Sequence, residues 1–90
     1  NCMIEIKKSE ITSLIISHYQ PQLKESAYQI YSFQQKYNCS FTELESNINS
    51  SEKEEYGQWE DYMEWKGHLK SAEHLTERIQ KIEHGLFTIA

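Results

Sequence analysis

The sequence predicts an all-α protein, an antiparallel hairpin of two long helices joined by a short connecting helix. Two long segments repeat apolar residues at steps of three and four, and a short stretch rich in helix-cap and turn residues separates them. The chain has 90 residues, which is enough for one domain, and its mean hydropathy of -0.76 indicates a thin core. We therefore expect a single helical domain over residues 1–90, with pairing of two copies into a four-helix bundle as an open possibility.

The first long helix is predicted over residues 10–37, after an extended lead-in over residues 1–9 in which Ser9 offers an N-cap hydroxyl. Pro21 lies inside this segment and lacks the N–H group that a helix interior needs, so we expect a kink or a break near residues 18–20. The apolar residues that form one stripe along this helix are Ile11, Ile15, Tyr19, Leu23, Ala27, Ile30, Phe33 and Tyr37.

The segment after the first helix carries signals of helix ends. Asn38 tolerates the left-handed conformation that often ends a helix. Ser40 and Glu43 have the spacing of a capping box, which predicts a short helix over residues 41–47. Turn residues follow, and Ser51 with Glu54 forms a second capping box at the start of the next helix.

The second long helix is predicted over residues 52–84. Gly85 serves as its C-cap, and an apolar tail follows over residues 85–90. Its apolar residues recur mostly at steps of three and four, and they are Tyr56, Trp59, Tyr62, Trp65, Leu69, Ala72, Leu75, Ile79 and Ile82.

Composition along the two long helices supports antiparallel pairing. Aromatic residues gather beside the turn on both helices, and on the first helix these are Tyr28, Tyr31, Phe33 and Tyr37. Aliphatic residues gather at the far ends, where we expect Ile11, Leu14, Ile15 and Ile16 to face Leu75, Ile79, Ile82 and Leu86. Residues 3–7 and 86–89 then emerge side by side and have the composition to pair as a short ribbon.

Charge is concentrated in one part of the chain. The net charge is -5, but residues 43–65 hold eight acidic residues against one lysine, Lys53, for a net charge of -7. Such a surface repels phosphates and attracts basic partners, so we expect no direct nucleic-acid binding. The chain has no long apolar run, and Cys2 and Cys39 lie too far apart along a helix to form a disulfide. These features predict a cytoplasmic protein without membrane contact.

No group of residues has the spacing of a catalytic or metal site. Glu60, Glu64 and His68 share one helix face, but the first helix offers no Glu-x-x-His partner, so a solvated face is the preferred interpretation. The four histidines share no metal-ligand spacing and have no neighbouring nucleophile, and three glycines are too few for a phosphate loop. We therefore expect a protein that is not an enzyme and that has no cofactor and no metal.

The most informative feature is the aromatic and acidic stripe at the start of the second long helix. It can simply be the core of the hairpin. It can also be an interface, because Trp and Tyr are enriched at binding hot spots and two helices have too few layers to cover every ring. The partner-binding residues that we predict are Tyr56, Trp59, Glu60, Asp61, Tyr62, Glu64 and Trp65.

Two short motifs resemble those of a group of small prokaryotic helical proteins. One motif reads KYNCSFTELE from Lys36 to Glu45, and the other reads WEDYMEW from Trp59 to Trp65. The group has a KYG-SFEEFE turn and a W-x-x-x-x-EW helix. The gene of such a protein often lies beside a toxin gene and encodes the antitoxin. The resemblance covers roughly residues 10–84, and this chain departs from the pattern by Asn38-Cys39 in the turn and by Pro21 in the first helix.

The resemblance implies an antitoxin that binds and neutralises a toxin. As a mechanism we expect the acidic stripe to dock onto a basic, ribonuclease-like cleft, with carboxylates in place of RNA phosphates and aromatic rings as anchors. The alternative is a self-associating structural or adaptor protein, a homodimer with coiled-coil packing. A dimer that is stable at low concentration favours the alternative, whereas a marginal monomer stabilised by a toxin partner favours the antitoxin.

Overall fold

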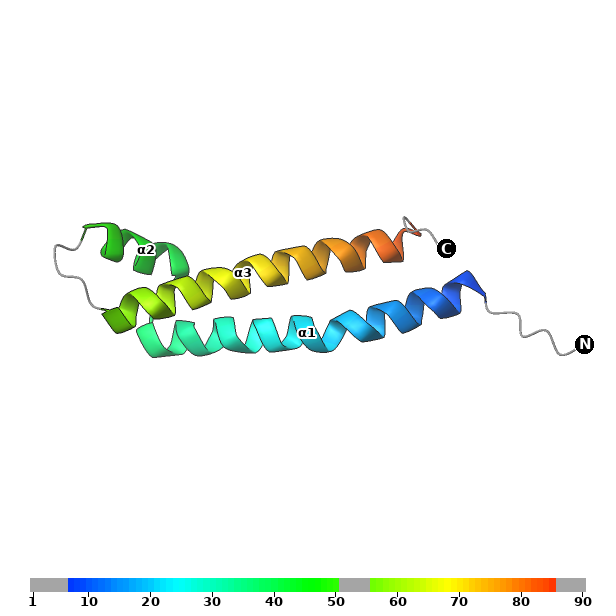
Figure 1. Cartoon of the computed structure of the whole chain (residues 1–90), viewed down its shortest axis with the longest axis horizontal. Helices are drawn as coiled ribbons and strands as arrows, with labels where there is room; N and C mark the ends of the chain where they lie inside the picture. The colour runs from blue at the N-terminus through cyan, green and yellow to red at the C-terminus, as the bar shows by residue number, and fades with distance from the viewer. Residues whose placement is uncertain (1–6, 51–55, 86–90) are drawn as a thin grey trace, which may run out of the picture.

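The structure, a computed structural model, describes residues 7–50 and 56–85 and is shown in Figure 1. The described part contains three helices and no strand: α1 (Lys8–Tyr37), α2 (Phe41–Ser50) and α3 (Tyr56–Glu83). The long helices α1 and α3 run antiparallel and pack along their length, and α2 packs on the other side of α3 (Figure 1). The predicted all-α hairpin is therefore confirmed.

Helix α1 begins at Lys8, earlier than expected, and Ser9 is not its N-cap. Lys7 holds that position with extended backbone, and it offers no side-chain cap. Its carbonyl accepts hydrogen bonds from the N–H groups of Glu10 (3.0 Å) and Ile11 (3.2 Å), so Ser9 already lies in the first turn. The helix then passes through Pro21 without a break.

The connection from α1 to α2 follows the predicted cap chemistry. Asn38 ends α1 in the left-handed conformation, with φ at 50°. The Ser40 hydroxyl accepts a hydrogen bond from the Glu43 N–H at 3.2 Å and donates one to Glu43 Oε1 at 3.3 Å. Helix α2 continues to Ser50, beyond the expected end at residue 47, because Ile48 lies one turn after Leu44 and packs against the same core.

A long-range polar contact joins the two long helices at the open end of the hairpin. Gly85 follows α3 with φ at 71°, as expected for a C-cap, and its carbonyl accepts a hydrogen bond from Lys8 Nζ at 3.2 Å. The second capping box at residues 51–54, the ribbon of residues 3–7 and 86–89, and Leu86 fall on residues outside the described ranges.

The core is concentrated beside the turn. Phe33 of α1, Leu44 of α2 and Trp65 of α3 form one buried cluster, so each helix contributes one residue to it. Tyr37 packs against this cluster, which agrees with the expected meeting of aromatic residues from both long helices. At the open end, Ile82 is the buried residue of α3.

The predicted stripe of α1 is buried or half-buried at every position except Ala27, which is exposed. Three large residues outside that stripe, among them Leu14, which was expected to face α3, are exposed as well. Tyr28, Tyr31 and Leu14 point away from α3 and are 63%, 57% and 68% exposed. Ser26 is buried where Ala27 was expected, because Ser26 lies four and seven residues before Ile30 and Phe33 and so shares their face. The face of α1 toward α3 is therefore narrower than the distribution of its apolar residues indicates.

Among the described residues, no helix carries an apolar stretch long enough to span a lipid bilayer.

Candidate functional site

Trp65 is the centre of the aromatic cluster beside the turn. Its side chain has no solvent exposure. Phe33 stacks on it at 5.8 Å between ring centroids, and Phe41 meets it edge-on at 5.5 Å. Because α1, α2 and α3 all contact this one indole, Trp65 holds the three helices together and has no surface left for a partner.

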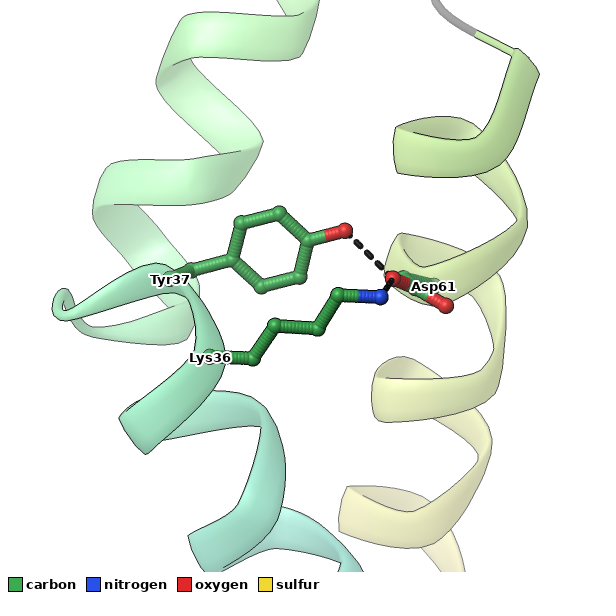
Figure 2. A network of polar contacts seen from close by, with 3 residues as sticks. All are labelled: Lys36, Tyr37 and Asp61. Carbon is green, nitrogen blue, oxygen red and sulfur yellow. Dashed lines mark hydrogen bonds and ion pairs between the residues drawn. The ribbon is translucent and has the colours of Figure 1, made fainter.

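Asp61 links α3 to the end of α1. It accepts a hydrogen bond from the Tyr37 hydroxyl and pairs with Lys36 Nζ at 2.5 Å, as Figure 2 shows. Partial burial raises the pKa of Asp61, but the hydrogen bonds from Lys36 and Tyr37 and the Lys36 charge outweigh it, so the pKa is lowered. This is the one ion pair among the described residues, and it neutralises a carboxylate that was predicted to face a partner.

Tyr62 joins α3 to α2. Its ring stacks on Phe41 at 5.3 Å with nearly parallel planes, and its hydroxyl donates a hydrogen bond to Glu45 Oε2 at 2.6 Å. The hydrogen bond to the Glu45 carboxylate raises the pKa of the Tyr62 hydroxyl, because that bond is lost when the hydroxyl ionises. Tyr62 therefore also has a structural role.

The outward face of α3 presents a mixed apolar and acidic surface. Trp59 is 51% exposed and Met63, one turn later, is 45% exposed. Glu60 and Glu64 lie beside them, are exposed, and have no ion-pair partner within residues 7–50 and 56–85. We name this surface, made of Trp59, Glu60, Met63 and Glu64, the α3 outer patch.

The structure thus divides the predicted partner-binding residues into two groups. Trp59, Glu60 and Glu64 face solvent, whereas Asp61, Tyr62 and Trp65 contact α1 or α2. The side chain of Tyr56, the seventh residue, lies outside what the structure describes.

Met63 belongs to the exposed group, but sequence reasoning did not select it. The signal that could have found it is its position four residues after Trp59, which places both side chains on one helix face.

Glu60, Glu64 and His68 do not converge. His68 is half-buried, with its ring centroid 6.4 Å from that of Phe33, while both glutamates are exposed. In the described part of the chain no group of three or more His, Cys, Asp or Glu side chains has a geometry that could hold a metal ion. Cys39 carries a free thiol.

Comparisons with family models, with curated proteins and with solved structures give no match for this chain.

Proposed function

We propose that this chain is a non-enzymatic protein-binding module, an antitoxin that binds and neutralises a basic, ribonuclease-like toxin through the α3 outer patch. The observation that carries the proposal is the exposure of a tryptophan beside two carboxylates that no described residue neutralises. Tryptophan is the residue most enriched at binding hot spots, and unpaired carboxylates attract a cationic cleft.

The α3 outer patch contains only some of the residues predicted to bind a partner, so the proposal assigns the contact to fewer side chains. Trp65 and Tyr62 support the fold, so the aromatic anchor of the complex is Trp59, with Met63 as an adaptable apolar neighbour. Glu60 and Glu64 stand one turn apart on the same face and supply the charges that take the place of two phosphates. Asp61, paired with Lys36, contributes little to this electrostatic attraction.

A pull-down with the product of the neighbouring gene tests the proposal. We expect Trp59→Ala and the double change Glu60→Lys/Glu64→Lys to weaken binding by at least about tenfold, because each removes an anchor or reverses two charges. The matched control is Glu73→Lys/Glu77→Lys, which makes the same charge change at exposed positions on the same helix.

The control double variant should bind like the unchanged protein, and binding of the unchanged protein should weaken with added salt. Equal loss in both double variants would mean that only net charge matters. Unchanged binding after Glu60→Lys/Glu64→Lys would contradict docking through the α3 outer patch.

A further inference from the structure

The described part of the chain holds two sulfur-containing side chains, and their environments differ. Cys39 is half-buried and packs against the cluster of Phe33, Leu44 and Trp65. Met63 is 45% exposed on the outward face of α3. Methionine is among the residues most often buried in folded proteins, so its exposure here is unusual. Of the two described sulfurs, the thioether of Met63 is the more open to a dissolved oxidant.

The surroundings of Met63 on α3 are open. Gly67 lies one turn further along the same face, is exposed and has no side chain. Apart from its two chain neighbours and the backbone of its own helix, no atom lies within 4 Å of the point where a Cβ of Gly67 would sit. Met63 is also not among the side chains that pack against the buried cluster. A change of polarity at Met63 should therefore leave the fold intact.

Met63 has a central place in the α3 outer patch. It lies one turn after Trp59, and residues four apart on a helix are neighbours. The other two members of the patch are the carboxylates of Glu60 and Glu64, so Met63 is one of only two apolar side chains that the patch offers to a partner. A chemical change at this sulfur therefore alters a large share of the apolar contact.

Peroxide converts a thioether into a sulfoxide. The sulfur attacks one oxygen of hydrogen peroxide, an S–O bond forms as the O–O bond breaks, and water leaves, so the sulfur is oxidised and the peroxide is reduced. A methionine sulfoxide reductase reverses the change, because it transfers the oxygen to water while a pair of thiols becomes a disulfide. The modification is therefore reversible.

We propose that Met63 is a reversible oxidation site that controls the α3 outer patch: peroxide converts its side chain to the sulfoxide, and the oxidised patch releases the basic partner. This regulation rests on the function proposed above, because it needs a partner bound at the same patch. A sulfoxide is polar, so burying it beside Trp59 carries a desolvation cost that a thioether does not have. Its oxygen is a neutral acceptor, whereas Glu60 and Glu64 bind the partner's cationic groups more strongly, so little of that cost is recovered.

Oxidation of the purified protein tests the modification and its effect on binding. The protein is treated with hydrogen peroxide, catalase removes the peroxide, and dithiothreitol reduces disulfides and sulfenic acids at Cys2 and Cys39 before the neighbouring gene product is added. We expect peptide mass spectrometry to find an added oxygen atom on Met63, and titration to show a Kd raised at least about fivefold. Circular dichroism should show unchanged helix content, and methionine sulfoxide reductase with dithiothreitol should restore the original affinity.

Met63→Leu is the matched control, because it keeps Met3, both cysteines and Trp59 but has no thioether at this position. Whatever its affinity before treatment, peroxide should leave that affinity unchanged. A loss of affinity on oxidation of Met63→Leu would place the effect elsewhere in the chain and overturn the proposal. The proposal would also be overturned by full binding of protein that carries the sulfoxide at Met63, or by a Met63 that stays unoxidised while free methionine in the same solution is converted.

Binding before oxidation separates this regulation from the function on which it rests. If the untreated protein does not bind the neighbouring gene product, the proposed function is wrong and the regulation is wrong with it. If the untreated protein binds and the sulfoxide at Met63 changes nothing, the proposed function stands and only the regulation by oxidation is wrong.

Discussion

Two tryptophans six residues apart on α3 have opposite environments. Trp65 is fully buried among three helices, whereas half of the surface of Trp59 faces solvent. Six residues turn an α-helix by about 600°, which leaves the two side chains about 120° apart around the axis. One tryptophan therefore stabilises the fold, and the other is available for binding.

Replacing the two tryptophans should separate stability from binding. Trp65→Ala should lower the free energy of unfolding by about 3–5 kcal/mol, because it leaves a cavity at the centre of the cluster, and Trp59→Ala by less than about 1 kcal/mol. The indole Nε1 of Trp65 has no hydrogen-bond acceptor among the described residues, so Trp65→Phe removes an unpaired donor and should cost only about 1–2 kcal/mol. Urea unfolding followed by circular dichroism measures all three values, and equal losses for Trp59→Ala and Trp65→Ala would contradict the assigned roles.

The Asp61 carboxylate should make stability depend on pH in the acidic range. Its pKa is lower in the folded chain than in the unfolded chain, where it takes the ordinary value of about 3.9. The ionised carboxylate therefore stabilises the fold above that pH, and this contribution is lost as the pH falls through the folded-state pKa.

Asp61→Asn is the variant that tests this linkage. Unfolding midpoints at neutral pH should be lower for Asp61→Asn than for the unchanged protein, and the difference should shrink toward pH 2. Glu73→Gln, which neutralises an exposed carboxylate on the same helix, should show no such dependence. A difference that stays constant with pH would show that the charge of Asp61 is not what stabilises the end of α1.

At the scale of elements, α2 depends on a cap and on two apolar anchors. Ser40→Ala removes the acceptor for the Glu43 N–H and should lower the free energy of unfolding by about 1 kcal/mol. Ser46→Ala is the control, because it changes an exposed interior position of the same helix to a better helix former and should be neutral or slightly stabilising. Thermal unfolding by circular dichroism compares the two, and an equal shift in both variants would argue against the cap.

The element boundaries were largely predictable because their signals are local. Asn38, Ser40 and Gly85 act through their own backbone conformation or through a partner three residues away, and the structure places each at the helix end where it was expected. The prediction of Ser9 as the N-cap of α1 was wrong, because the Lys7 carbonyl accepts the first helical hydrogen bonds without any side-chain cap. The end of α2 was missed because Ile48 packs against another helix, and no local signal encodes that contact.

At the scale of the whole molecule, the hairpin has its three helices in the order α1, α3, α2 (Figure 1). Its main cluster of buried side chains lies beside the turn. This order leaves the outward face of α1 and the outward face of the first part of α3 uncovered by other described helices. The outward face of α1 carries the exposed side chains of Leu14, Tyr28 and Tyr31, whereas the α3 outer patch carries two carboxylates beside Trp59 and Met63. Of these two faces, the α3 outer patch is the one that our proposal assigns to a basic partner.

The sequence by itself determined the helices, most of their ends, their antiparallel pairing and the aromatic cluster beside the turn, since hydrophobic spacing and cap chemistry are properties of the chain. Only the tertiary structure decided which aromatic residues are buried. Tyr56, Trp59, Tyr62 and Trp65 follow one another at steps of three, and each such step turns about 60° back around the helix, so four residues cannot share one face. The packing of Phe33 and Leu44 against Trp65 sets the rotation of α3 about its axis, and that rotation turns Trp59 toward solvent.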